Sequence, residues 1–141
     1  MSVPEGKRTE SKLRVQTQSR ELARHTMQLC SNEKIFPKRD RWILSSRIMD
    51  TALAIMENVD FANDIQAVTP VDFALRRKSQ TIALASTAKM IGLIDLAYTR
   101  YGIEGNRVSY WVGLVLEVRE LVKKWRQSDK TRFESLMKGR S

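Results

Sequence analysis

The sequence is poor in the residues that build catalytic and metal sites. Its 141 residues include a single histidine, His25, and a single cysteine, Cys30. One imidazole and one thiol cannot supply the ligands of a zinc site, and no Glu-x-x-His pair of the di-metal bundle type is present. No glycine-rich phosphate-binding motif occurs either. We therefore expect no metal, no cofactor and no catalytic activity.

Other absences bear on the setting of the protein. A single cysteine excludes an internal disulfide and suits a reducing, cytoplasmic location. The start of the sequence, MSVPEGKRTESKLR, has no apolar segment of the signal-peptide type. No window reaches the 18 or so apolar residues of a membrane-spanning helix. These features predict a cytoplasmic protein that is not embedded in a membrane.

Proline and glycine are also scarce, with three and six residues, which disfavours a turn-rich all-β fold. What the sequence does contain is apolar residues at helical spacing. Four helices are expected, over about 11–30, 38–63, 70–101 and 106–130. Short connections between them predict an all-α, antiparallel, up-down-up-down four-helix bundle. We expect residues 1–10 to be flexible, 11–130 to form the bundle and 131–141 to be a basic C-terminal tail.

Local signals set the expected helix ends. Pro37 suits the first turn of the second helix. Thr69 can cap the third helix, with Pro70 at its first position and Asp72 completing a capping box. Glycines 102 and 105 end that helix, and Asn106 or Ser109 can cap the last one. The third helix is expected to bury a stripe comprising Leu84, Thr87, Ile91, Ile94, Tyr98 and Tyr101.

Two polar residues have alternative interpretations. Cys30 is interpreted as a small buried thiol. Asp95 lies within the apolar run MIGLIDLAY. It is expected either to pair with a basic residue of the last helix or to occupy the boundary of the core.

The positive charge is the most informative feature. With 25 basic and 16 acidic residues, the net charge is +9. Such a balance favours RNA as a partner, with DNA or an acidic membrane surface as further polyanions, but a solvated surface that maintains solubility explains it equally well. The candidate nucleic-acid-binding residues are Lys38, Arg39, Arg41, Arg76, Arg77, Lys78, Arg119, Lys123, Lys124 and Arg126.

The three cations after Pro37 raise a specific question. Lys38, Arg39 and Arg41 fall in the expected first turn of a helix, where the helix dipole disfavours positive charge. An anionic partner would offset this cost, and so would Asp40 or acidic groups of a neighbouring subunit. Both explanations remain open from the sequence.

Two segments resemble a family of small four-helix-bundle proteins. The first is FPKRDRWILSSRIMDTALAIMENVDFAN, and the second is IEGNRVSYWVGLVLEVRELVKKW, which ends at Trp125. The family includes the accessory variability determinants of diversity-generating retroelements and relatives encoded in intervening sequences of ribosomal RNA genes. Those relatives carry a Glu-Gly-Phe-Gly-Arg-type segment where this chain reads NVDFANDIQ, so the retroelement branch is more similar. The resemblance spans roughly residues 12–128.

The resemblance implies a barrel-like homo-oligomer, a pentamer in the type case. It also implies a non-catalytic protein that binds reverse transcriptase and template RNA and supports mutagenic cDNA synthesis. The run Arg76–Lys78 has no counterpart that we can match in the family, and the first ten residues are unplaced. The alternative is a structural module that oligomerises or docks to a protein without binding RNA.

Overall fold

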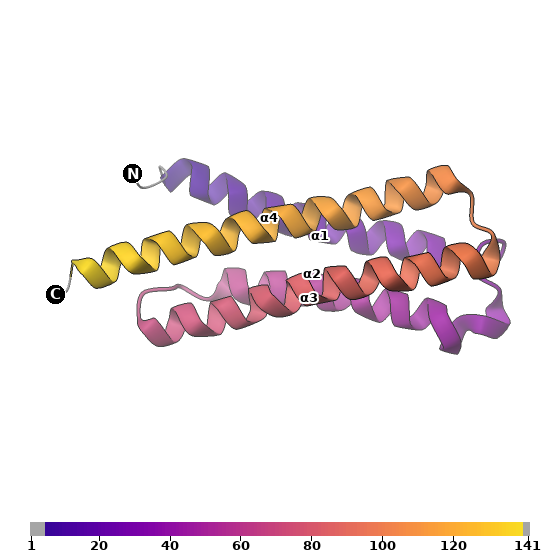
Figure 1. Cartoon of the computed structure of the whole chain (residues 1–141), viewed down its shortest axis with the longest axis horizontal. Helices are drawn as coiled ribbons and strands as arrows, with labels where there is room; N and C mark the ends of the chain where they lie inside the picture. The colour runs from indigo at the N-terminus through magenta and orange to yellow at the C-terminus, as the bar shows by residue number, and fades with distance from the viewer. Residues whose placement is uncertain (1–4, 140–141) are drawn as a thin grey trace.

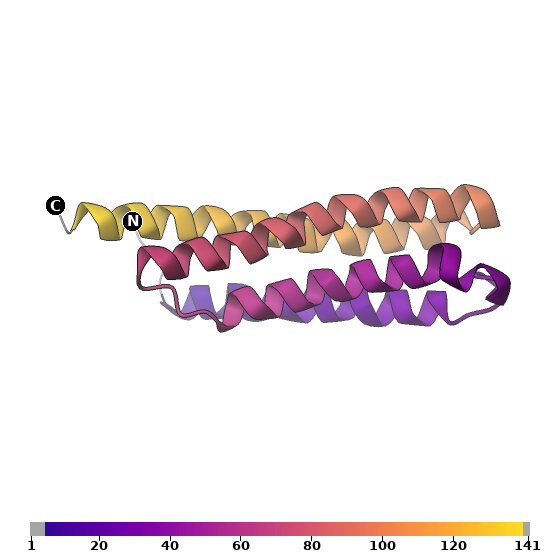
Figure 2. The ribbon, with the colours of Figure 1, turned by 90° about the horizontal axis from the view of Figure 1, so that it is seen from below.

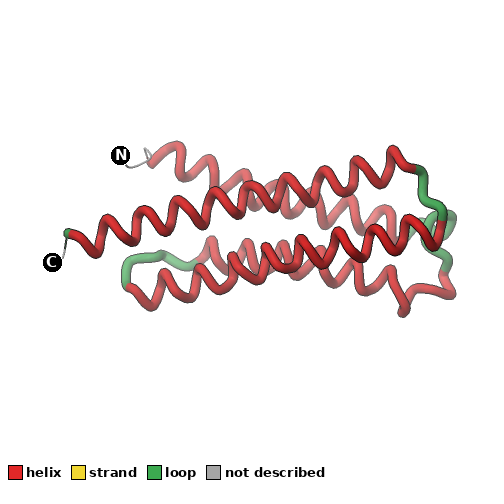
Figure 3. The backbone as a smooth tube through the Cα atoms, in the orientation of Figure 1, coloured by secondary structure: helices red, strands yellow, loops and turns green. Residues whose placement is uncertain are grey.

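The computed structural model describes residues 5–139, with side chains placed from residue 14. Its helices are α1 (Glu5–Cys30), η1 (Lys38–Asp40, a 3-10 turn), η2 (Arg41–Ser45, a π-helical turn), α2 (Ser46–Asp64), α3 (Pro70–Tyr101) and α4 (Gly105–Lys138). No strand occurs within these described residues. The long helices run up, down, up and down (Figure 1), joined by short connections (Figure 3). The prediction of an all-α four-helix bundle is confirmed.

The bundle has two layers of two helices. Helices α1 and α2 form one layer, and α3 and α4 form the other (Figure 2). Long helices that are consecutive in the chain contact one another, and α4 closes the ring by packing on α1. The last turns of α4 extend past the end of the other helices.

The core follows the expected stripes of α2 and α4. Along α4, the side chains that face inward are Trp111, Val115, Val118, Val122 and Trp125. Trp111 is completely buried, and its indole N–H donates a hydrogen bond to Thr26 Oγ1 at 3.0 Å. Its ring meets Phe36 edge-on, with centroids 6.1 Å apart. Each such buried apolar side chain contributes about 1.5–3 kcal/mol by leaving water.

The stripe predicted for α3 is confirmed in part, since Leu84, Thr87 and Ile94 are buried, and Ile91 and Tyr101 pack partly buried against the core. Tyr98 is exposed, whereas Met90 and Ala97 are fully buried. The buried positions of α3 are Phe73, Arg76, Ser79, Gln80, Ala83, Leu84, Thr87, Met90, Ile94 and Ala97. Arg76, Ser79 and Gln80 also face the core near the start of α3, where an apolar pattern does not reveal the buried side. By length and composition α3 could also span a membrane, contrary to the expectation from the sequence. Its apolar window is 28% buried inside the bundle, and mostly buried core helices of soluble proteins pass the same test.

The ends of α3 are as predicted, except that Gly105 is the first residue of α4. Thr69 Oγ1 accepts a hydrogen bond from the Asp72 backbone N–H at 3.2 Å, and Asp72 Oδ2 accepts one from the Thr69 N–H at 3.0 Å. This reciprocal capping box satisfies two backbone donors that the helix cannot. At the other end Gly102 has a left-handed φ of 61°, which glycine adopts without steric cost.

The ends of α1 and α4 differ from the prediction. Helix α1 begins at Glu5, so part of the segment expected to be flexible is helical, while residues 1–4 lie outside the described residues. Asn106 and Ser109 lie inside α4, which starts after Glu104 without a side-chain cap. Helix α4 continues to Lys138 through most of the expected tail. The extension is stabilised by packing, because the rings of Phe73 and Phe133 are 5.1 Å apart.

The predicted helix 38–63 is divided into three parts. Pro37 precedes the 3-10 turn η1, the π-helical turn η2 follows, and regular α-helix begins at Ser46. Asp40, at the junction of the two turns, points inward. Its Oδ2 accepts a hydrogen bond from Arg100 Nε at 2.9 Å. This contact ties the start of the α2 segment to the end of α3.

Candidate nucleic-acid interface

The first basic surface surrounds an exposed tryptophan at one end of the bundle. We call it the Trp42 surface and define it by Lys38, Arg39, Arg41, Trp42 and Ile43. All five are exposed to solvent at least in part, with Trp42 at 80% and Ile43 at 60%. None of its three cations forms an ion pair among the residues that the structure describes. Cations beside an exposed aromatic ring suit a polyanion that also carries rings.

Asp40 is the carboxylate closest in sequence to this surface, and it is engaged inside the bundle. It is only 4% exposed and pairs with Arg100 of α3. The hydrogen bond from Arg100 is the main cause that holds the pKa of Asp40 below its usual range. Asp40 therefore stays ionised, but its negative charge is directed into the bundle. The exposed side of residues 38–43 remains positively charged.

The second basic surface lies between α3 and α4 near the opposite end. We call it the α3–α4 surface and define it by Arg77, Lys123, Arg126 and Lys130. Arg77, Arg126 and Lys130 line one groove. Burial, and then the neighbouring Arg77 charge, lowers the pKa of Arg126. Cations held close together attract anions.

Three of the predicted residues are placed less favourably for binding. Arg76 is 1% exposed, and its Nε lies 2.9 Å from Asp129 Oδ2 in the interior. Arg119 is half-buried and donates hydrogen bonds to the Leu84 carbonyl at 3.0 Å and to Thr87 at 2.9 Å. Lys123 is exposed but pairs with Glu120 at 3.3 Å. The structure thus gives Arg76 and Arg119 structural contacts inside the bundle.

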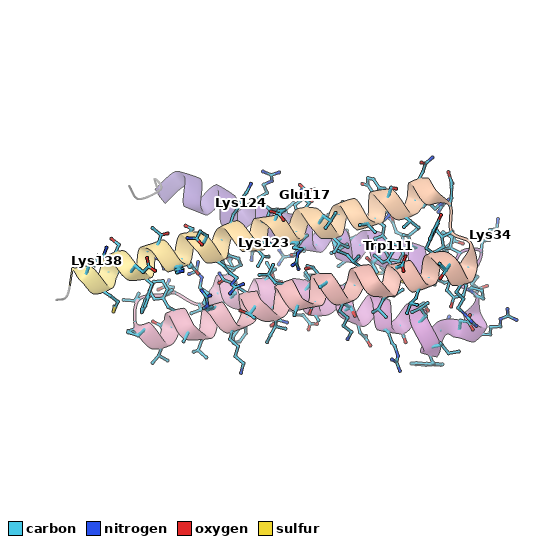
Figure 4. The ribbon with its side chains drawn as sticks, in the orientation of Figure 1. Lys34, Trp111, Glu117, Lys123, Lys124 and Lys138 are labelled. Carbon is cyan, nitrogen blue, oxygen red and sulfur yellow. The ribbon has the colours of Figure 1, made fainter. Side chains whose placement is uncertain are left out.

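The remaining predicted residues are exposed but separated. Lys78 lies on α3 immediately after Arg77. Lys124 lies on the α1 side of α4, whereas Lys123 lies on the α3 side (Figure 4).

The two basic surfaces lie far apart along α3. Arg100, which is tied to the Trp42 surface through Asp40, lies 23 residues beyond Arg77 on the same helix. At 1.5 Å per residue the two surfaces are about 35 Å apart.

Sequence reasoning missed two exposed cations. Arg47 lies one helical turn after Ile43 and extends the Trp42 surface. Lys130 follows Arg126 by four residues, and this spacing places both on one side of a helix.

The other candidate groups do not form a reactive site. Burial raises the pKa of the Cys30 thiol to about 12. Burial also lowers the pKa of His25, whose ring lies 5.0 Å from that of Tyr110. Asp95 is exposed rather than paired in the core. Within residues 5–139 no group of three or more His, Cys, Asp or Glu side chains could hold a metal ion.

Comparisons with protein-family models, curated proteins and solved structures give no match for this chain.

Proposed function

We propose that the protein is a non-catalytic RNA-binding accessory protein that assists the reverse transcriptase of a diversity-generating retroelement. The observation that carries the RNA-binding part is the pair of exposed cationic surfaces. The Trp42 surface has three cations for which the described residues provide no ion pair. The connection to a reverse transcriptase rests on the sequence resemblance described above.

The two surfaces suit an extended partner. Their separation of about 35 Å requires a ligand that presents phosphates along its length. RNA does so, and Trp42 adds an aromatic face on which an unpaired base can stack. RNA loops and ends display such bases, whereas a perfect duplex does not.

The experiment is a salt series of binding to a structured RNA and to duplex DNA of equal length. We expect tight RNA binding that weakens by decades between about 50 and 200 mM salt. Replacing Lys38, Arg39 and Arg41 by glutamine should lower the magnitude of the log–log salt slope by about 1 for each phosphate that the protein no longer neutralises.

The matched control removes the same charge from α1. Arg14, Arg20 and Arg24 are partly exposed, and each pairs with an acid of the chain. Their replacement by glutamine should change affinity much less than the Trp42-surface variant. Equal losses in the two variants would mean that only net charge matters. Absence of RNA binding at physiological salt would refute the proposal.

A second candidate function is a protein-docking or self-assembling module. The observation that favours it is the outer side of α3, where Val71, Leu75 and Leu96 are 67%, 48% and 57% exposed. Such side chains are suited to contact a protein, including a second copy of this chain as the resemblance implies. Recording the oligomeric mass on the same sample distinguishes an RNA-binding oligomer from an oligomer that ignores RNA.

A further inference from the structure

A groove of about 390 Å³ lies between the start of α3 and the late turns of α4. It exists because α4 continues past residue 130 and places Phe133 opposite Phe73. Its volume is in the range of sites for small ligands. None of the sequence motifs predicts it, since its two walls are about 50 residues apart in the chain.

The apolar part of the groove is aromatic. Phe73 and Phe133 line it, with ring planes inclined by 56°. Pro70 and Ala74 extend the same wall. A wall of this kind favours a flat, apolar ring over a branched aliphatic group, since planar rings gain offset or edge-to-face contacts with it.

The polar part contains an unused acceptor and an unused donor. Gln80 is 1% exposed, and its Nε2 donates to Asp129 Oδ2 at 3.0 Å. Its Oε1 is buried and has no hydrogen-bond partner among the described residues, and neither has the buried Nε of Arg126. Buried polar atoms are rarely left unpaired. A ligand edge with one donor and one acceptor would satisfy both atoms, provided that the Gln80 and Arg126 side chains shift to open them to the groove.

The charge of the groove favours an anion. Arg77, Arg126 and Lys130 line it, against the carboxylates of Asp129 and Glu134. Asp129 is already engaged by the guanidinium of Arg76 at 2.9 Å, so Glu134 is the carboxylate left to oppose the three cations. An aliphatic or aromatic carboxylate would meet these cations but would leave the Gln80 acceptor unpaired.

We propose that this groove binds one unpaired nucleotide, its base against Phe133, its polar edge on Gln80 and Arg126, and its phosphate on Arg77 and Lys130. This inference rests on the proposed RNA-binding function and specifies one contact within it. Such a groove makes the protein bind RNA with an extruded or single-stranded base more tightly than a perfect duplex.

The first test titrates the full-length protein separately with AMP, ribose 5-phosphate and phenylacetate. Each titration is monitored by the NMR signals of the backbone amides. AMP should bind at least tenfold more tightly than the other two and shift the signals of Gln80 and Phe133. Phenylacetate binding as tightly as AMP would overturn the proposal in favour of a site for amphipathic anions. No shift with millimolar AMP would also overturn it.

The second test separates this inference from the proposed function. Phe133 is only half-buried, so Phe133→Leu should remain folded, as checked by circular dichroism. Removing one base-stacking partner should weaken binding of a single-stranded RNA by about tenfold, with duplex affinity changed by less than about twofold. The control is Phe61→Leu, because Phe61 is 58% exposed on α2 and does not line the groove. Salt-dependent RNA binding that Phe133→Leu leaves intact would refute the groove and spare the proposed function.

Discussion

Arg76 and Arg77 are adjacent, and the structure predicts opposite consequences for their replacement. Arg76 is 1% exposed, and Asp129, its ion-pair partner, is 13% exposed. Its guanidinium also lies 5.2 Å from the centre of the Trp125 ring, and Nη1 donates to the Ile65 carbonyl at 3.3 Å. Arg76→Met removes all of these interactions and leaves Asp129 without its counter-charge.

The loss in free energy of unfolding expected for Arg76→Met can be worked from these interactions. Breaking a buried ion pair by removing one partner costs about 3–5 kcal/mol, mainly because the remaining charge is buried and uncompensated. Asp129 keeps the hydrogen bond from Gln80 and some solvent access, which places the cost near the lower end, at about 3 kcal/mol. Arg77→Met changes an exposed side chain and should stay within about 0.5 kcal/mol.

Urea unfolding followed by circular dichroism measures the difference. With a slope of about 1–3 kcal/mol/M, Arg76→Met should lower the urea midpoint by roughly 1–3 M and Arg77→Met should barely move it. RNA affinity, measured where both variants are folded, should show the reverse order. A double variant, Arg76→Met with Asp129→Leu, should recover much of the lost stability.

Two results would refute this reasoning. One is an Arg76→Met protein within about 1 kcal/mol of the parent, which would mean that the buried pair contributes little. The other is a folded Arg76→Met protein that loses as much RNA affinity as Arg77→Met. That result would return Arg76 to the binding surface that the sequence suggested.

The remaining predictions concern local features. Gly102→Ala should cost about 1 kcal/mol because φ is +61°, whereas Gly92→Ala, with open space around the added Cβ, should raise stability by about 0.5–1 kcal/mol; thermal melts measure both. The hydrogen bond from Arg100 lowers the folded-state pKa of Asp40, so its stabilisation is complete above the ordinary aspartate pKa and is lost as pH falls through the lowered value. Urea midpoints from neutral to acidic pH should therefore fall less steeply for Asp40→Asn. With a pKa of about 12, Cys30 should react with a disulfide reagent at pH 8 on the order of a thousandfold more slowly than a free thiol, until the protein is unfolded.

The number and order of the helices could be predicted because their signals are local. The inward stripe of α4 repeats at helical spacing, and the capping box of α3 involves only Thr69 and Asp72. The late turns of α4 could not be predicted in this way. They are held by contacts with residues far away in the chain, such as Phe133 on Phe73 and Arg132 Nη2 donating to the Ala67 carbonyl at 2.9 Å.

The sequence predicts which cations are candidates for the site, but it does not predict which of them share a surface. Arg76 lies in the phase of the buried stripe of α3, between Phe73 and Gln80, and an interpretation based on polarity assigns it to solvent instead. An acid at the matching height of another helix allows arginine at such a position, because it compensates the buried charge. That acid is Asp129, which is 53 residues away in the sequence, and no local pattern links the two.

The structure changes the explanation for the energetic cost of the cations after Pro37. Regular α-helix begins at Ser46, so Lys38, Arg39 and Arg41 precede the first turn of α2, where the dipole effect has its main influence. The cost to be offset is therefore mostly their mutual repulsion. Asp40 interacts electrostatically with Arg39, but its carboxylate is turned inward, where it pairs with Arg100. The same ion pair fixes the segment before any partner arrives, which reduces the ordering entropy that binding would cost.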